Sequence, residues 1–188
     1  MSRSNAIVQG SIQDMANQQH TSVAEALLGC DFVCLLDVSG SMGSHDSRGG
    51  QRRFDVAVEE LGNLQRQHPG KIAVMGFSDH PEWAPSGFPT FQGGGTDLTN
   101  ALQFGLALDG TVTFIVLSDG EPNDEESALR TAKQFTSRID TVYVGPPDDR
   151  RGLDFLRRLA AASGGQSVVA EKAADLADHV EVLMLKGM

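Results

Sequence analysis

The side chains most able to do chemistry are carboxylates and hydroxyls, and they occur in three short motifs. The first motif, DVSGS, carries Asp37, Ser39 and Ser41 at alternate positions. The second motif, GGTD, carries Thr96, and the third, SDGE, carries Asp119. These side chains offer only oxygen ligands, without thiolate or imidazole. Hard oxygen ligands suit Mg²⁺ or Mn²⁺ rather than zinc, so the three motifs predict a divalent-metal site.

The spacing of the first motif explains how one loop can supply several ligands. Alternate spacing lets one extended loop aim all three of its polar side chains at the same point. Gly40 permits the bend, and the glycines at 93–95 permit close approach of the second loop. Because most direct ligands are neutral hydroxyls, a bound divalent cation stays under-neutralised. Such a site keeps a position for a carboxylate from outside the protein.

Three other interpretations of Asp37 compete with the metal site. A polar turn also uses serine and glycine for its bend. A phosphatase of the haloacid dehalogenase type also begins from an aspartate after the first strand. That enzyme needs a second acid two residues later, where this chain has Ser39, and a lysine near the third loop. A serine hydrolase needs a G-x-S-x-G elbow and a triad histidine, whereas Ser39 follows Asp37 and Val38.

Charged side chains flank the motifs. His45, Asp46 and Arg48 belong to a glycine-rich loop after the first motif, which is either a solvated loop or a rim that selects the ligand. Residues 80–83 include a histidine, a glutamate and the single tryptophan, which suit an interaction surface or core packing equally. Four acids that follow Asp119 in and after the third motif are best explained as favourable charges at a helix start. These acids are Glu121, Asp124, Glu125 and Glu126.

Five apolar runs rich in β-branched residues indicate the strands that must position these motifs. Each run is nearly continuous rather than alternating, which is typical of parallel strands covered on both faces. The first run ends at the first motif, and the third ends at the third motif. The runs are residues 31–38, 71–77, 111–118, 139–145 and 166–170.

Helical periodicity fills the gaps between the strands. Apolar residues recur there at steps of three and four, and Asn123 or Asp124 can cap the third helix. Alternating strands and helices of this length predict an α/β fold, with a mostly parallel, doubly wound sheet and helices on both faces. The five periodic sets are Phe54, Val58, Leu61 and Leu64; Leu98, Leu102 and Leu106; Ala128, Leu129, Ala132 and Phe135; Phe155, Leu156 and Leu159; and Ala173, Leu176, Ala177, Val180 and Leu183.

Two segments depart from this rhythm. Residues 79–95 hold three prolines and four glycines, so they predict at most a short edge strand around 88–91. Ahead of the first strand, residues 11–28 predict one helix that presents Ile12, Met15, Val23, Ala26 and Leu27. We therefore expect residues 1–30 to form a helical N-terminal extension that packs on a domain spanning residues 31–188.

Composition narrows the class of protein. The chain has 188 residues, which suits one domain, and its net charge of −10 argues against a nucleic-acid binder. No signal peptide and no run of 18 apolar residues is visible, so we expect a cytoplasmic protein with no membrane contact. Cys30 and Cys34 lie about 13 Å apart along a strand, too far for a disulfide. They are best explained as small buried hydrophobes in a reducing compartment.

The motifs also resemble a known family. DVSGSM (37–42), GGTDL (94–98) and SDGEPND (118–124) resemble the three loops of the von Willebrand factor A (vWA) domain, in the family's order. The resemblance covers about residues 31–185 and includes Gly76-Phe77-Ser78-Asp79 after the second strand. It implies a Rossmann-like sheet of about six strands with one antiparallel edge strand. In this family the loops form the metal-ion-dependent adhesion site, known as MIDAS.

The resemblance implies ligand roles and a function. Ser39, Ser41 and Thr96 would bind Mg²⁺ or Mn²⁺ directly, and Asp37 and Asp119 would bind it directly or through water. The chain would then be a protein-interaction module, not an enzyme, whose metal captures an aspartate or glutamate of a partner protein. Stand-alone bacterial members suggest a MoxR-type AAA+ ATPase as partner, or a stress or conflict system. The family also implies that the last helix shifts when metal ligation changes.

Two alternatives of other classes stay open. A metal-dependent phosphohydrolase would use the same cage to bind phosphate, and it needs a general base or nucleophile near the metal. His45 and His80 are the free candidates for that base. A structural component of a larger assembly would differ only in its partner.

Overall fold

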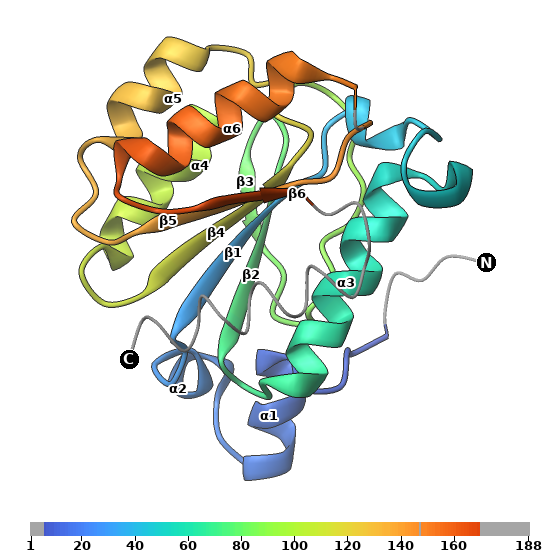
Figure 1. Cartoon of the computed structure of the whole chain (residues 1–188). Helices are drawn as coiled ribbons and strands as arrows, with labels where there is room; N and C mark the ends of the chain where they lie inside the picture. Colours follow the sequence, from blue (N-terminus) through green and yellow to red (C-terminus); the bar gives the residue numbers. More distant parts are fainter. Residues whose placement is uncertain (1–5, 147, 170–188) are drawn as a thin grey trace.

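The computed structural model describes residues 6–146 and 148–169, and these form a six-stranded sheet in the order β3-β2-β1-β4-β5-β6 (Figure 1). All neighbouring strands are parallel except β2 and β3, which are antiparallel. The prediction of a doubly wound, mostly parallel sheet with one antiparallel edge strand is therefore confirmed. The strands are β1 (Phe32–Asp37), β2 (Ile72–Phe77), β3 (Pro81–Trp83), β4 (Thr113–Ser118), β5 (Ile139–Tyr143) and β6 (Ser167–Val169).

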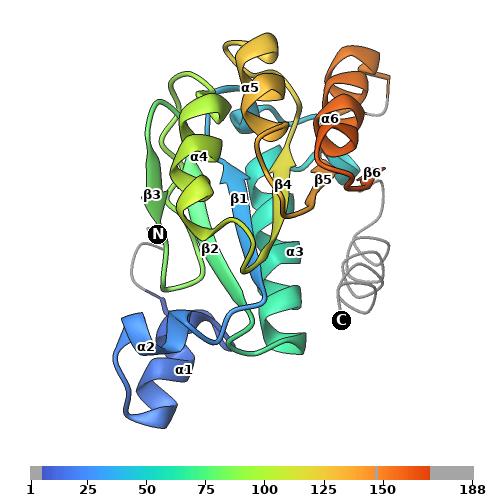
Figure 2. The ribbon, with the colours of Figure 1, turned by 90° about the vertical axis from the view of Figure 1, so that its left-hand side faces the viewer.

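Helices cover both faces of the sheet. The helix α3 lies on one face, and α4, α5 and α6 lie on the other (Figures 1 and 2). Within the described ranges, no helix has the length and apolar character needed to cross a membrane. The predicted fifth helix and its movement fall on residues 173–183, outside the described part of the chain. The α-helices are α1 (Ile12–Gln19), α2 (Val23–Leu27), α3 (Arg53–Gln67), α4 (Leu98–Gly105), α5 (Glu125–Ala132) and α6 (Arg150–Ala162), and the short 3₁₀ helices are η1 (Ser41–Gly43), η2 (Arg48–Gly50) and η3 (Leu106–Leu108).

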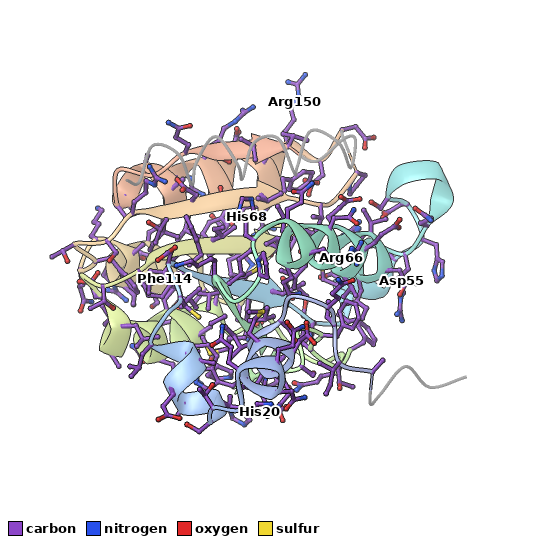
Figure 3. All side chains as sticks on the ribbon, turned by 90° about the horizontal axis from the view of Figure 1, so that it is seen from below. His20, Asp55, Arg66, His68, Phe114 and Arg150 are labelled. Carbon is purple, nitrogen blue, oxygen red and sulfur yellow. The ribbon has the colours of Figure 1, made fainter. Side chains whose placement is uncertain are left out.

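The central strand β1 shows why the sheet needs cover on both sides. All six of its residues are buried. Because successive side chains of a strand point to opposite faces, Cys34 and Leu36 pack in the cluster beneath α3, and Leu35 packs in the cluster beneath α4 and α6. Side chains fill the space between the layers, with Phe114 among them and Arg150 pointing away from the body of the protein (Figure 3). Cys34 is a free, buried thiol, as predicted, whereas Cys30, for which the sequence predicted the same, is only half-buried.

The N-terminal segment contains two helices where the sequence predicted one. The break falls at His20, which adopts a left-handed conformation with φ of 56° and ends α1. Ser22 then starts α2 with a capping box, in which Ser22 and Glu25 satisfy each other's backbone N–H groups. The α1 helix buries Ile12 in the cluster beneath α4. Both helices lie at the end of the sheet opposite the loops that follow β1 and β4 (Figures 1 and 2).

The position predicted for the edge strand was wrong. The strand β3 begins only a few residues after β2 and pairs with its Met75–Phe77 stretch, so the hairpin forms before the proline-rich segment. Residues 88–91 instead run irregularly and pack on the α3 side, where Phe91 meets Phe54 with ring centroids 5.5 Å apart. Pro89 crosses so close to Gly76 that a Cβ there would lie 2.7 Å from the proline Cβ.

Candidate metal centre

The first and third predicted motifs meet at the carboxyl ends of β1 and β4. Asp37 is the last residue of β1, and Asp119 follows Ser118 at the end of β4. These two strands are neighbours at the centre of the sheet. The strand order runs outward in opposite directions from this pair, and ligands of doubly wound sheets bind at such a switch point.

The carboxylate of Asp37 is fixed by one hydrogen bond on each oxygen. The Ser39 N–H donates to Oδ1 at 2.9 Å, and the Ser118 hydroxyl donates to Oδ2 at 2.7 Å. The Gly120 N–H donates in turn to the Ser118 hydroxyl at 3.0 Å. Ser118 therefore joins the first and third loops. The sequence motifs did not indicate this role, although a serine at the buried end of an apolar strand is itself unusual.

The two serines of the first motif lie side by side. The hydroxyl oxygens of Ser39 and Ser41 are 3.2 Å apart. Ser39 is fully buried, whereas Ser41 is half-buried at the start of η1. Two hydroxyl oxygens this close together are suited to share a cation.

The second loop is tied to both of the others. The Gly40 N–H donates to the Gly94 carbonyl at 3.1 Å, which joins the first and second loops. The Thr96 N–H donates to Asn123 Oδ1 at 2.9 Å, and the Asn123 N–H donates to the Thr96 carbonyl at 2.9 Å. This reciprocal pair joins the second and third loops and holds Thr96 in a buried position. The sequence indicated Asn123 only as a candidate helix cap, and Asp124 fills that role.

Close packing against Asp79 explains why the second loop contains glycines. Gly94 has a φ of 79°, and a Cβ there would lie 2.6 Å from Asp79 Oδ2. Asp79 Oδ1 accepts a hydrogen bond from the Gly95 N–H at 3.0 Å. Asp79 therefore braces the loop from the β2 side, at a distance that only glycine permits.

Asp119 has unequal surroundings on its two oxygens. Its Oδ2 accepts a hydrogen bond from Arg53 Nη1 at 2.8 Å, while its buried Oδ1 has no hydrogen-bond partner. Arg53 begins α3 and also grips Asp46 through Nε at 2.7 Å and Nη2 at 2.6 Å. This hydrogen-bonded pairing lowers the pKa of Asp46. The sequence pattern indicated either a solvated loop or a ligand-selecting rim for Asp46, and it indicated no role for Arg53.

The electrostatics of the site favour a cation. Burial, followed by the charge of Asp119, raises the pKa of Asp37 to about 6, although hydrogen bonds from Ser39 and Ser118 act in the opposite direction. Two buried carboxylates that repel each other gain from a positive ion between them. The unpartnered Asp119 Oδ1 is an oxygen that such an ion would satisfy. The structure thus brings the three loops together, and the residues present fit a Mg²⁺ or Mn²⁺ ion.

The donor set is rich in hydroxyls and poor in carboxylates. No group of three or more His, Cys, Asp or Glu side chains with metal-binding geometry occurs in residues 6–146 and 148–169. That finding agrees with the predicted site, because only two of its five residues, Asp37 and Asp119, belong to those four types. The other three ligands are hydroxyls. Metal ligation by Asp37, Ser39, Ser41, Thr96 and Asp119 stays a prediction.

Comparison with known proteins identifies relatives by structure only. No family model and no curated protein matches the chain. An aerotolerance-related membrane protein from Bacteroides fragilis is 16% identical with a TM-score of 0.68, and the match covers 84% of this chain and 100% of that chain. The vWF domain of the type V pili tip protein Mfa5 from Porphyromonas gingivalis is 12% identical with a TM-score of 0.63, covering 85% and 96%. The manganese-loaded TRAP protein from Plasmodium vivax is 15% identical with a TM-score of 0.56, covering 80% and 72%.

Likeness at these identities shows the fold alone. The strand order, the antiparallel edge strand and the similarity to a vWF domain agree with one another. The described part of the chain therefore has the von Willebrand factor A fold that the three motifs predicted.

Proposed function

We propose that this protein is an interaction module that binds a divalent metal ion and, through it, an acidic side chain of a partner protein. The observation that carries the proposal is the pair of buried carboxylates, Asp37 and Asp119, at the switch point. In this pair, Oδ1 of Asp119 has no hydrogen-bond partner. Asp37, Ser39, Ser41, Thr96 and Asp119 would hold the ion. The manganese-loaded TRAP neighbour supports a metal in this fold.

Each residue of the site has a separate task in this proposal. Ser118 and the Ser39 N–H orient the Asp37 carboxylate, and Asn123 fixes the backbone beside Thr96. The bound ion supplies a Lewis acid with an open position for an outside carboxylate. The hydroxyls of Ser39 and Ser41 add no charge, so the site keeps positive charge for that outside acid.

The negative net charge of the protein explains why binding an acidic partner would need a metal ion. At a net charge of −10 the protein repels an acidic partner surface at long range. A divalent ion at the site offsets this repulsion where the two surfaces meet. A cytoplasmic partner such as a MoxR-type AAA+ ATPase belongs to the same proposal, and the free thiols of Cys30 and Cys34 support a reducing compartment.

The proposal is tested by metal-dependent stabilisation. We expect MnCl₂ or MgCl₂ to raise the melting temperature of the wild-type protein, because a ligand that binds only the folded state stabilises it by about 2.7 kcal/mol at 100 times its Kd. Thr96→Ala and Asp37→Ala remove a predicted ligand and should abolish most of this shift. Asp124→Asn changes an exposed acid of the neighbouring helix and should leave the shift intact.

Two outcomes would contradict the proposal. Equal metal-induced shifts in the wild type and both ligand variants would show that the ion binds elsewhere. Metal-dependent hydrolysis of p-nitrophenyl phosphate would favour a phosphohydrolase instead, and its persistence after loss of the exposed His45 and His80 would exclude a histidine base. A pull-down in Mg²⁺ and in EDTA, read by mass spectrometry, then identifies metal-dependent partners.

A further inference from the structure

Arg53 occupies an unusual position for a buried cation. It is the first residue of α3, a helix of 15 residues, and it is 7% exposed. Positive charge is unfavourable at a helix N-terminus, where the backbone dipole is itself positive. No side-chain cap satisfies this end of α3. Something other than helix stability must therefore explain why an arginine is buried there.

The surroundings of Arg53 supply that explanation. One edge of its guanidinium, formed by Nε and Nη2, holds both oxygens of Asp46 in a two-pronged contact. The remaining nitrogen, Nη1, reaches Asp119 Oδ2 at 2.8 Å. The Asp119 side chain is fully buried, whereas that of Asp46 is 42% exposed. Arg53 thus connects a carboxylate of the metal site to a carboxylate at the surface.

In this arrangement Asp119 can contact two cations, the guanidinium of Arg53 and the predicted metal ion. Arg53 uses one oxygen and leaves Oδ1, the oxygen predicted to face the metal, without a partner. A guanidinium fork prefers to bind both oxygens of a carboxylate. Asp46 occupies the Nε–Nη2 fork of Arg53, and Arg53 meets Asp119 through Nη1 alone. Without Asp46, the fork would be free to take both oxygens of Asp119.

We propose that Arg53 is an internal competitor of the divalent ion for Asp119, and that Asp46 restrains it by filling its guanidinium fork. The inference rests on the proposed function, because it concerns the same metal site. The loop after the first motif thereby sets the affinity of the site for metal. A protein with an unrestrained Arg53 binds the ion weakly, and a protein without Arg53 binds it tightly.

The experiment measures the Kd of Mn²⁺ by calorimetry on EDTA-treated, dialysed full-length protein. We expect Arg53→Gln to lower the Kd about tenfold, since it removes a positive charge beside the ion. Asp46→Asn should raise the Kd about tenfold in the wild-type background and less than about threefold in the Arg53→Gln background, because no competitor then remains. Arg53→Gln should also lower the melting temperature of the metal-free protein. If Arg53 had only a structural role, its replacement would not lower the Kd of Mn²⁺.

A control variant on the same helix isolates the position of the charge. Arg66→Gln makes the same change near the other end of α3 (Figure 3), about 20 Å away by helix rise. There the Arg66 guanidinium donates a hydrogen bond to the Asn63 side chain. It should leave the Kd of Mn²⁺ within about twofold. Arg53→Lys keeps the charge without the fork and should stay closer to the wild type than Arg53→Gln does.

The outcomes separate this inference from the proposed function. If neither the wild type nor Arg53→Gln binds Mn²⁺, both are wrong. If the wild type binds Mn²⁺ and Arg53→Gln binds it equally or more weakly, only the inference is overturned. If Arg53→Gln does not fold, an unchanged Kd for Asp46→Asn overturns it, because Asp46 is 42% exposed and asparagine keeps an oxygen that accepts from Arg53.

Discussion

The residues that hold the ligands are as important to the candidate site as the ligands themselves. Thr96 has a useful hydroxyl only if its backbone is fixed, and the reciprocal hydrogen bonds with Asn123 fix it. Asp37 depends in the same way on Ser118, which lies 81 positions away in the chain. Such supporting contacts reduce the freedom that a ligand loses when the ion binds, which is the basis of preorganisation.

Replacement of Asn123 should separate metal affinity from stability. Asn123→Ala removes the acceptor of the Thr96 N–H, and a hydrogen bond of this kind contributes about 1 kcal/mol. We expect the Kd of Mn²⁺ to rise about tenfold, as for other residues that position metal ligands. The matched control is Asp124→Ala, which removes the helix cap next to it and costs about 1 kcal/mol of folding stability. Calorimetry should find the Kd of that control unchanged; equal losses of affinity in both variants would deny Asn123 its positioning role.

Residue types and their order in the sequence predicted the five ligands but not their supports. Asp37, Ser39, Ser41, Thr96 and Asp119 belong to motifs that can be recognised one loop at a time. Arg53 acts on Asp119 across 66 positions, and its position at a helix start gives no local sign of that contact. Contacts of this kind depend on how α3 packs beside the sheet, which no local pattern specifies.

At the level of elements, the loops at the amino ends of the strands also carry tight polar contacts. Asp109, after η3, accepts hydrogen bonds from the N–H groups of Thr136 and Ser137 at 2.7–3.1 Å and from the Thr136 hydroxyl at 2.9 Å. These bonds join the segment before β4 to the segment before β5. Slight burial acts to raise the pKa of Asp109, but the hydrogen bonds together outweigh it and lower the pKa to about 2.

This contact predicts a pH-dependent contribution to stability. Because the pKa of Asp109 is lower in the folded state than its value of about 3.9 in an unfolded chain, its contribution is complete above about pH 4. The contribution is lost as the pH falls through the folded pKa of about 2. We expect Asp109→Asn to lower the free energy of unfolding by about 1 kcal/mol at pH 7, a modest value because solvent screens the exposed carboxylate.

Urea unfolding of the wild type and Asp109→Asn between pH 7 and pH 3 measures this difference. The gap between the two proteins should stay constant down to about pH 4 and narrow below it. Asp154→Asn, which removes an exposed acid on α6, serves as the control and should differ little from the wild type at any pH. If the difference in the free energy of unfolding keeps its full size at the lowest pH where both proteins fold, the Asp109 carboxylate is excluded as its cause.

The elements themselves were predictable where their hydrophobic pattern is long. The helices α3 and α6 have 15 and 13 residues, and the periodicity of each was clear in the sequence. The short elements were not predictable to the same degree. The break between α1 and α2 depends on one left-handed residue, His20, and β3 has only three residues held by pairing with β2. Those features follow from a turn and from a partner strand, not from a repeat in the sequence.

On the scale of the whole molecule, the candidate site and the N-terminal helices lie at opposite ends of the sheet (Figures 1 and 2). The N-terminal segment is attached by packing and by backbone hydrogen bonds, such as Val8 N–H to the Ser86 carbonyl at 2.9 Å. It also packs closely on Gly87, where a Cβ would lie 2.9 Å from the Val8 Cβ. The helix α1 at this end contributes apolar burial, whereas the other end contains the buried carboxylates of Asp37 and Asp119. The two ends should therefore respond independently to mutation.

Ile12→Ala tests this independence. Ile12 is 2% exposed, and truncation of a buried isoleucine costs about 2–5 kcal/mol of folding stability. Effects at distant sites without shared contacts add, so the Kd of Mn²⁺ for the folded variant should stay within about twofold of the wild type. Leu28→Ala, at a residue that is 87% exposed, is the control and should change stability by less than about 0.5 kcal/mol. Urea unfolding and Mn²⁺ calorimetry on the same samples measure both quantities. A Kd that rises together with the loss of stability would mean that the sheet couples its two ends, and the metal site would then report on the packing of the N-terminal helices.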